Sequence, residues 1–467
     1  MPAGTPYDYR GDGEDYAYNG DDDLALPPSS SEESGAEGPP EAPFNEDSGA
    51  DGPSEGPSAS HDWAPPPSHP NVHPSAPSVV FNVMDYGAVP NRKKDNTKAF
   101  SIAWGEACAK KGKEATLFVP NLSFYLGPMK FEGPCYQNES PKVEIQGTLV
   151  APANLGAFPD KHWISFRNLN GIEVTGGGAS TFGILDGQGH KAWQKRKHHK
   201  LTEYRVFFPT LNLTNSCILS LITLLNSKGY HMSFTGSKNI RVHDINITAP
   251  WNSPNTDGIH TGTTDNINIT NSVIGVGDDC VSIGPGTTNV HIHKVSCGPG
   301  HGISIGSLGK YKDEDDVGEV HVRNCTISDT TNGVRIKTWP DSEPSKAYNI
   351  SFVDVVVRNV TNPIIIDQEY CPSDGCKFSK PSRVQISNVT FLNITGTTSP
   401  KPHPAVSIIC SRGAPCQDVK LIQVNLTQVI LDGDQRPAIN ETGLLKVNDF
   451  VKDLEVINSP LLIVNDE

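Results

Sequence analysis

Two aspartates stand side by side in GVGDDCVSIG (275–284), a stretch that otherwise alternates like a β-strand. Strands disfavour aspartate and neighbouring carboxylates repel each other, so the pair needs a reason to be there. Asp257, in SPNTDGIH, lies 21 residues before Asp278, and His301, in CGPGHGISIG, lies 22 residues after Asp279. Carboxylates gathered beside a histidine are the residue types that general acid–base chemistry requires.

Two cations and a phenol follow these acids along the chain. Arg335 and Lys337 lie two apart in NGVRIKTW, so in a strand they share a face, and Tyr370 follows in IDQEYC. Arginine binds a carboxylate with two hydrogen bonds, and lysine adds a point charge. Two cations on one face near acidic groups therefore suit an anionic ligand that carries a carboxylate.

A weak repeat supplies the framework that could bring these residues together. Its units hold short alternating runs separated by a polar turn, and they start at Asn239, Asn266, Asn289, Glu319, Asn349, Arg383 and Asp418. Periods of about 20–50 residues indicate a solenoid or a propeller, but a propeller blade needs four strands in about 40–45 residues. Units this short predict an all-β fold, a right-handed parallel β-helix whose coils stack about 4.8 Å apart.

Stacking turns residues one coil apart in sequence into neighbours in space. The spacing predicts a polar column along one groove, made of Asp257, Asp278, Asp279, His301, Arg335, Lys337 and Tyr370. Asp278 and Asp279 would face opposite ways in a regular strand, so both reach the groove only if the chain bends or bulges there. Gly277 and a Cys280–Cys297 bridge could hold such a bend.

The first 78 residues differ in composition from the rest. They hold sixteen Asp and Glu against one basic residue, Arg10, which accounts for the whole formal net charge of −15. The segment is rich in Pro, Gly and Ser and poor in large apolar residues, so it cannot offset the entropy of ordering. We expect a disordered acidic tail over 1–78, as a solvated spacer rather than an interaction segment, and one catalytic β-helix domain over 79–467.

A single helix is expected, as a cap on the N-terminal end of the β-helix. DNTKAFSIAWGEACAKK (95–111) has apolar residues at helical spacing after Asp95 and Asn96, which are both good N-cap residues. The basic cluster WQKRKHHK (193–200) is interpreted as a surface loop or as a patch that attracts an acidic polysaccharide. The neutral body has no aromatic–basic platform for nucleic acid, and no run approaches the ~20 apolar residues of a membrane span.

Cysteines and glycosylation sequons indicate an oxidising compartment. The closely spaced pairs are Cys280 with Cys297, Cys371 with Cys376, and Cys410 with Cys416. Sequons such as those at Asn138, Asn212, Asn349 and Asn388 agree with this, although the pattern also falls naturally at strand ends. No leader follows Met1, so we expect a secreted cell-wall or extracellular protein whose signal peptide is missing from this sequence. No CxxC pair or histidine cluster suggests a metal site, and no cofactor is expected.

The motifs that carry these residues are NTDG (255–258), GDDC (277–280), GHG (300–302) and RIK (335–337). In this order they resemble the signatures of polygalacturonases, pectin-degrading glycoside hydrolases with a right-handed parallel β-helix. The resemblance extends through NPIIIDQEYC and more loosely from Phe81 to about Asp434, and SIGPGT and SLGKYKDEDDV are most similar to the exo-acting plant branch, which includes pollen enzymes. The acidic tail and the cysteine-free region after Asp434 depart from the family pattern.

The resemblance implies inverting hydrolysis of α-1,4-linked galacturonic acid in pectin, by exo action from the non-reducing end. It assigns Asp278 as the general acid, Asp257 and Asp279 as the residues that position and deprotonate the water, and His301 as the residue that controls the acid. It also assigns Arg335 and Lys337 to the sugar carboxylate, Tyr370 to the sugar ring, and Asn255 to the substrate loop. His260 is interpreted as structural, and the loop KYKDEDDVGE (310–319) as solvated, with Lys310 or Tyr311 as rim contacts at most.

Three other hypotheses stay open. The first is an endo-acting polygalacturonase, the second a calcium-dependent pectate lyase on a similar β-helix, and the third a catalytically silent β-helix that binds wall polysaccharide. Taken alone, the Asp-Asp pair could be a turn or a calcium site, and His301 a buried hydrogen-bonding residue. Their joint order and coil spacing favour the catalytic hypothesis. The expected partner is polygalacturonate, with no nucleic acid and no membrane, and the chain is expected to act as a monomer.

Overall fold

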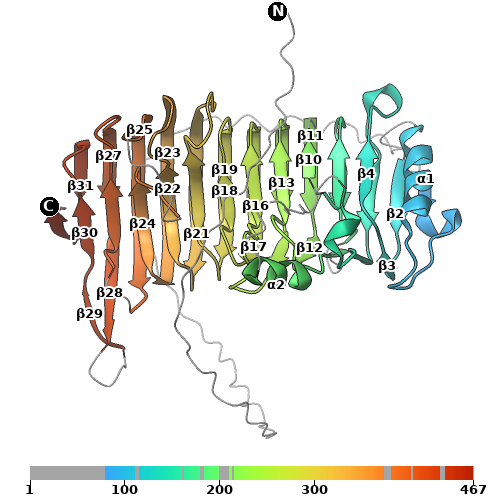
Figure 1. Ribbon diagram of the computed structural model, residues 1–467, viewed down its shortest axis with the longest axis horizontal. Helices are drawn as coiled ribbons and strands as arrows, with labels where there is room; N and C mark the ends of the chain where they lie inside the picture. The colour runs from blue at the N-terminus through green and yellow to red at the C-terminus, as the bar shows by residue number, and fades with distance from the viewer. Residues whose placement is uncertain are drawn as a thin grey trace, which may run out of the picture. The chain divides into compact units, whose positions relative to one another are not determined.

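The computed structural model describes residues 79–110, 115–159, 162–178, 183–198, 210–212, 215–372, 380–400, 403–431 and 437–465. The predicted disordered tail, 1–78, lies outside them. The described strands form a 20-stranded sheet and a 12-stranded sheet (Figure 1). Every pairing between these strands is parallel except that of β28 (Asn425–Leu431) with β29 (Pro437–Thr442). The β class and the stacked parallel arrangement predicted from the sequence are confirmed.

The repeat units found in the sequence are consecutive strands of the larger sheet. They are β14 (Lys238–His243), β17 (Asp265–Gly275), β19 (Thr288–Cys297), β21 (Val317–Ser328), β23 (Ser345–Val360), β25 (Val384–Thr398) and β27 (Cys416–Ile422). Each pairs in parallel with the next, and the predicted starts at Asn239, Asn266, Asn289, Glu319 and Asn349 occupy equivalent register positions. The predicted start at Arg383 is too early, because Asn388 is the residue in register with Asn349 and Asp418. Residues one repeat apart in the sequence are therefore neighbours in space.

Asparagine at the start of these units has a conformational reason. Asn239, Asn266 and Asn289 have φ of 56°, 59° and 56°, in the left-handed region that asparagine tolerates better than most residues. Their side chains also stack from coil to coil, since the Asn266 amide donates to the Asn239 side-chain oxygen at 2.7 Å. The polar residue thus bends the chain and satisfies its own hydrogen bonds along the stack.

The smaller sheet separates the core from the outer face that carries the predicted site. Its central strands are β16 (Ile259–Gly262), β18 (Val281–Ile283), β20 (Ile303–Leu308), β22 (Asn332–Thr338), β24 (Asn362–Asp367) and β26 (Val406–Ile409). One register position is occupied by Ile259, Val281, Ile303, Val334, Ile364 and Val406, all fully buried. The next position carries His260, Ser282, Ser304 and Arg335. Because side chains alternate across a strand, this polar column faces away from the apolar core.

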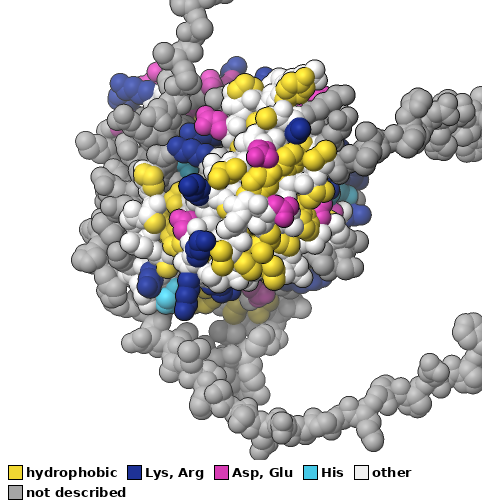
Figure 2. Space-filling view, turned by 90° about the vertical axis from the view of Figure 1, so that its right-hand side faces the viewer, with side chains coloured by type: hydrophobic (Ala, Val, Ile, Leu, Met, Phe, Trp, Pro, Cys, Tyr) yellow, Lys and Arg dark blue, Asp and Glu magenta, His cyan; other side chains and the backbone are white. Residues whose placement is uncertain are grey.

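Helix α1 (Thr97–Cys108) confirms the predicted N-terminal helix. It packs against β1 (Val79–Asn82), β2 (Ala115–Val119) and β4 (Met129–Glu132), burying residues such as Phe100. The side chain of Asp95, not that of Asn96, caps it, accepting from the Thr97 amide at 2.9 Å. Figure 2 shows this end of the molecule, where hydrophobic and charged side chains mix on the surface.

The expectation of a single helix is wrong. Helix α2 (His190–His198) contains most of the basic cluster that the sequence placed in a loop. Its anchor is Trp193, which is buried and donates its indole N–H to the Ser227 carbonyl at 3.0 Å. One buried aromatic therefore docks a helix whose apolar stripe is too short to be recognised by periodicity. None of the helices in the described ranges is long and apolar enough to cross a membrane.

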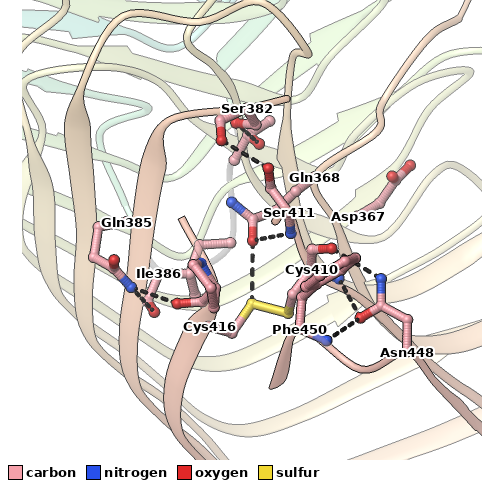
Figure 3. The surroundings of a disulfide bond; sticks show 12 residues. Asp367, Gln368, Ser382, Gln385, Ile386, Cys410, Ser411, Cys416, Asn448 and Phe450 are labelled. Carbon is pink, nitrogen blue, oxygen red and sulfur yellow. Dashed lines mark hydrogen bonds between the residues drawn. A yellow bond between two sulfur atoms is a disulfide. The ribbon is translucent and has the colours of Figure 1, made fainter. Parts of the chain in front are cut away.

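Disulfides close several coils. The predicted Cys280–Cys297 and Cys410–Cys416 bridges are present, together with a Cys108–Cys135 bridge that the sequence did not indicate. Cys371 is also disulfide-bonded, but its predicted partner, Cys376, lies outside the described residues. Figure 3 shows the Cys410–Cys416 bridge beside Asn448, whose side chain accepts from the Cys410 amide at 3.1 Å and donates to the Cys410 carbonyl at 2.8 Å.

The region after Asp434, which departs from the family pattern, continues both sheets. Strand β31 (Val451–Ile457) pairs with β27, and β30 (Leu444–Val447) pairs with β26 and with β32 (Leu462–Asn465). Leu462 and Ile463 on β32 are 57% and 60% exposed. This end of the sheets therefore presents apolar side chains to solvent.

Candidate active site

The adjacent aspartates lie in a turn between two strands, not within one strand. Strand β17 ends at Gly275 and β18 begins at Val281, so the chain turns at Gly277, Asp278 and Asp279. A Cβ atom on Gly277 would lie 2.1 Å from the Ser253 carbonyl oxygen, so this close packing requires glycine. The predicted bend therefore exists, and it lies between two strands. Because neither aspartate is part of a strand, the two side chains need not point to opposite faces.

Three of the predicted site residues occupy equivalent coil positions. Asp257, Asp279 and His301 each precede by two residues a member of the aligned core column that begins with Ile259. Neighbouring turns are also joined through the backbone, since the Gly258 amide donates to the Asp279 carbonyl at 2.9 Å. Asp278 lies one position earlier, and Arg335 and Lys337 lie within β22. The site is thus built from adjacent columns rather than the single column that spacing alone predicted.

Asp279 is the centre of the cluster and is only 1% exposed. Its Oδ1 accepts from Arg335 Nη2 at 2.9 Å and from the Ser304 hydroxyl at 2.7 Å. Its Oδ2 accepts from Lys337 Nζ at 2.9 Å. Charge-assisted bonds of this kind are the strong ones in protein interiors, so the Asp279 carboxyl group is held in a fixed orientation.

Asp278 pairs with His301 instead. The His301 Nδ1 lies 3.1 Å from Asp278 Oδ1, which also accepts from the Asp279 amide at 2.8 Å. Burial alone would raise the pKa of Asp278, but the charges of His301, Lys337 and Arg335 hold it well below its ordinary value. Burial likewise disfavours the charged imidazole, but Asp278 outweighs it and raises the pKa of His301 above its ordinary value. The two groups form an ion pair that holds one proton on the histidine.

Asp257 is in the opposite electrostatic position. It is 5% exposed, and its Oδ2 accepts from the Ser282 hydroxyl at 2.7 Å. Burial, followed by the charges on Asp278 and Asp279, raises the pKa of Asp257 well above its ordinary value. Neighbouring carboxyl groups whose pKa values are pushed in opposite directions are typical of sites that divide acid and base roles.

Aromatic side chains border the two cations. The Tyr370 ring centroid lies 5.2 Å from Lys337 Nζ and 5.9 Å from the Arg335 guanidinium carbon. Trp339 packs edge-on against Tyr370 with ring centroids 5.6 Å apart, and Lys310 Nζ lies 5.3 Å from the Trp339 ring. A cation–aromatic rim therefore continues the cluster toward the next coils, which is a surface suited to an acidic sugar chain.

Comparison with known proteins identifies the group to which this arrangement belongs. Residues 108–440 match the model of glycosyl hydrolases family 28. The chain belongs to this family, the polygalacturonase family. It is 43% identical over 350 residues to an exopolygalacturonase of Platanus acerifolia, covering 74% of this chain and 90% of that one. It is 41% identical over 354 residues to a polygalacturonase of Gossypium barbadense, covering 75% and 84%.

A solved structure shares the same architecture. The endo-xylogalacturonan hydrolase of Aspergillus tubingensis aligns with a TM-score of 0.63 and 21% identity, covering 78% of this chain and 98% of that chain. At this identity the likeness concerns the fold alone. The stacked parallel sheets of the present family 28 chain are thus shared with a structure of distant sequence.

Two hydroxyl groups of this family 28 site were not singled out from the sequence. Ser282 donates to Asp257 and Ser304 donates to Asp279, and each serine follows its aspartate by 25 residues. One coil plus three residues is therefore a constant offset that spacing could have revealed. Trp339 was also missed, because an aromatic just after the RIK motif has no distinguishing pattern of its own.

Asn255 lies at the edge of the cluster. It is half-buried in the turn before β16 and has φ of 52°. It lies two positions before Asp257, so its left-handed backbone helps the turn to place that carboxylate. A direct role in binding substrate stays a prediction.

The side chains of Asp278, Asp279 and His301 place one ligand atom each within 4.8 Å of one another. Two carboxylates and an imidazole can in principle coordinate a divalent cation. In this site, however, both Asp279 oxygens already accept from Arg335 and Lys337. Arg335 and Lys337 therefore supply the positive charge that a metal ion would supply. The two carboxylates and the imidazole fit ion pairing within the protein better than metal binding.

Proposed function

We propose that this enzyme hydrolyses α-1,4-galacturonosyl linkages in polygalacturonate, the acidic chain of pectin, on a right-handed parallel β-helix domain over 79–467. The observation that carries the proposal is the cluster in which Asp278, Asp279 and His301 lie within 4.8 Å of one another beside two cations. Membership of family 28 and the printed names of the relatives support polygalacturonase activity. A general acid, a general base and two cations are then available around one glycosidic bond.

Arg335 and Lys337 supply the selectivity for uronic acid in this proposal. Each sugar of the substrate carries a carboxylate, which two adjacent cations bind more tightly than a neutral sugar. The Lys337 ammonium has three N–H donors, and its contact with Asp279 uses one of them. The Tyr370 ring beside both cations packs against the sugar face, and Asn255 supports the loop that borders it.

Asp278 is the general acid, and His301 is its proton reservoir. In the unliganded site the proton resides on His301, because nearby positive charge keeps the pKa of Asp278 low. A substrate carboxylate at Arg335 and Lys337 adds negative charge and raises the pKa of Asp278. The proton then moves from His301 Nδ1 to Asp278 Oδ1 over a 3.1 Å hydrogen bond and from there to the glycosidic oxygen as the bond breaks.

Asp257 and Asp279 hold and deprotonate the attacking water. Asp279 is oriented by three donors, and the raised pKa of Asp257 makes that carboxylate a stronger base than an ordinary aspartate once it is ionised. Inverting glycosidases usually hold their acid and base carboxyl groups about 6.5–9.5 Å apart, whereas ligand atoms of Asp278 and Asp279 lie within 4.8 Å of each other here. Inversion is therefore proposed from the family resemblance and not from this separation. Direct displacement by this water gives a product of inverted anomeric configuration.

Exo action from the non-reducing end is the finer part of the proposal. The name of the Platanus acerifolia relative supports it, whereas the Gossypium barbadense relative is named only as a polygalacturonase. Disulfides in the described residues agree with secretion to the cell wall. The acidic segment 1–78 is proposed to be a solvated spacer.

Digestion of polygalacturonate tests the proposal. Reducing ends are measured, products are sized by anion-exchange chromatography, and the first anomer formed is observed by proton NMR. We expect galacturonic acid as the earliest product and the β anomer before mutarotation. Oligomers at early times would replace exo by endo action. An unsaturated product absorbing in the ultraviolet would indicate a lyase, and an absence of new reducing ends would overturn the proposal.

A further inference from the structure

Two serines on the outer face make the same contact in successive coils. Ser282 donates to Asp257 at 2.7 Å, and Ser304 donates to Asp279 at 2.7 Å. Each serine also lies against a nitrogen at its own register position. Arg335 Nε donates to Ser304 Oγ at 3.1 Å, and His260 Nδ1 lies 2.8 Å from Ser282 Oγ. Two hydrogen-bonded chains of the same form result, each running from a nitrogen through a serine hydroxyl to a carboxylate. One is His260–Ser282–Asp257 and the other is Arg335–Ser304–Asp279.

The hydrogen count decides how the His260 chain is ordered. A serine hydroxyl has one hydrogen, so when Ser282 donates it to an ionised Asp257, its oxygen can only accept from His260. The imidazole must then carry its hydrogen on Nδ1. Arg335 cannot act otherwise, because guanidinium only donates. His260 therefore donates to Ser282 as Arg335 donates to Ser304, and each serine donates in turn to an aspartate.

We propose that His260, acting through the Ser282 hydroxyl, is a positioning residue that holds Asp257 as an ionised hydrogen-bond acceptor. The inference rests on the proposed function, which makes Asp257 a base, and it revises the structural role that the sequence suggested for His260. The hydroxyl alone can rotate away from the carboxylate. A donor fixed on its other side keeps its hydrogen aimed at Asp257 Oδ2.

The surroundings of both groups favour such a device. Asp257 faces the negative charges of Asp278 and Asp279 and the positive charge of Lys337. Two like charges oppose its ionisation, so a directed donor is needed to offset them. The His260 ring is itself fixed, because Tyr230 from the preceding coil packs on it with ring centroids 4.7 Å apart. The imidazole orientation is therefore set independently of substrate.

The test is the acidic limb of the pH dependence of kcat/KM, which reports the protonation of the base in the free enzyme. Ser282→Ala and His260→Leu should both move this limb to higher pH by about one unit, so that activity below the limb falls about tenfold. His260→Asn places an amide N–H near the Nδ1 position and should restore the limb to that of the wild type. A rescue of this kind separates a directed hydrogen bond from simple packing.

The chain offers a matched control on its larger sheet. His321 Nδ1 lies 2.8 Å from Ser351 Oγ, and the two residues are in register on β21 and β23 of the larger sheet, whereas His260 and Ser282 lie on the smaller sheet. His321→Leu removes the same type of contact and should leave the limb in place. The proposal would be overturned if the acidic limb of kcat/KM did not move in His260→Leu. It would also be overturned if the limb moved in His260→Leu but His260→Asn did not restore it.

A second measurement keeps the inference separate from the proposed function. Histidine-specific ¹⁵N labelling reports which ring nitrogen carries hydrogen, and the His260 signal is assigned by its loss in His260→Asn. We expect the Nδ1–H form in the wild type at pH 7.5 and a shift toward the Nε2–H form in Ser282→Ala. An Nε2–H tautomer in the wild type would refute the inference even in an active enzyme. An Nδ1–H tautomer in an enzyme inert toward polygalacturonate would refute the proposed function instead.

Discussion

Lys337 donates to Oδ2 of Asp279 at 2.9 Å, although the two residues lie 58 positions apart in the sequence. Both are buried, with exposures of 5% and 1%. A buried ion pair has a large desolvation cost, which is offset only when further hydrogen bonds complete it, as Arg335 and Ser304 do here. The stability of the site therefore depends on keeping both the Lys337 cation and the Asp279 carboxylate.

Loss of one partner of this pair should destabilise the fold as well as the site. Lys337→Met leaves a buried anion short of one cation, and the free energy of unfolding should fall by about 3–5 kcal/mol. Chemical denaturation measures this loss. Lys420→Met removes a cation that is paired on the exposed face with Asp418 and Glu455, and it should change stability little. Equal effects of the two substitutions would contradict the buried-pair account.

The His301–Asp278 pair predicts the alkaline side of the activity profile. Because Asp278 raises the pKa of His301, the shared proton persists above the ordinary histidine value of about 6.5 and is lost as pH rises through the raised value. The stability that His301 contributes is complete below its unfolded-state pKa and is lost as pH rises through the raised value, whereas the share of Asp278, whose pKa is lowered, is present above its unfolded-state pKa and is lost as pH falls. In His301→Gln the proton must reside on Asp278 alone, so the alkaline limb of kcat/KM should move to lower pH. A limb that stays in place would remove His301 from the mechanism.

Much of this architecture could be predicted from the sequence because a solenoid converts sequence spacing directly into spatial neighbourhood. Repeat starts such as Asn239 and Asn266, and the spacing of Asp257, Asp279 and His301, therefore placed strands and acids correctly. The bend predicted at Asp278 is present, but the alternation in GVGDDCVSIG concealed that it lies between two strands rather than within one.

Contacts across coils were harder to predict because they depend on which face a side chain takes. Ser282 and Ser304 look like ordinary strand residues until the register sets them beside the aspartates. Helix α2 was missed because Trp193 is the one large side chain that anchors it among the described side chains of the helix, beside the small Ala192. Arg335 and Lys337 were expected on the substrate, and the structure shows that they first bind Asp279.

Removal of divalent cations should leave activity unchanged. The acidic cluster already receives positive charge from Arg335 and Lys337, so no metal is needed to hold Asp279 or the sugar carboxylate. Activity on polygalacturonate is measured after dialysis against EDTA and again after calcium is restored. Loss on chelation with recovery by calcium would instead favour a metal-dependent lyase.

The most direct test compares the wild type with Asp278→Asn in a reducing-end assay on polygalacturonate. Asparagine keeps the size of the side chain but cannot deliver the proton, so the rate should fall by about 10²–10⁴-fold. Circular dichroism and the melting temperature establish that the variant is folded. A rate equal to that of the wild type would contradict the claim that Asp278 is the acid in this cluster.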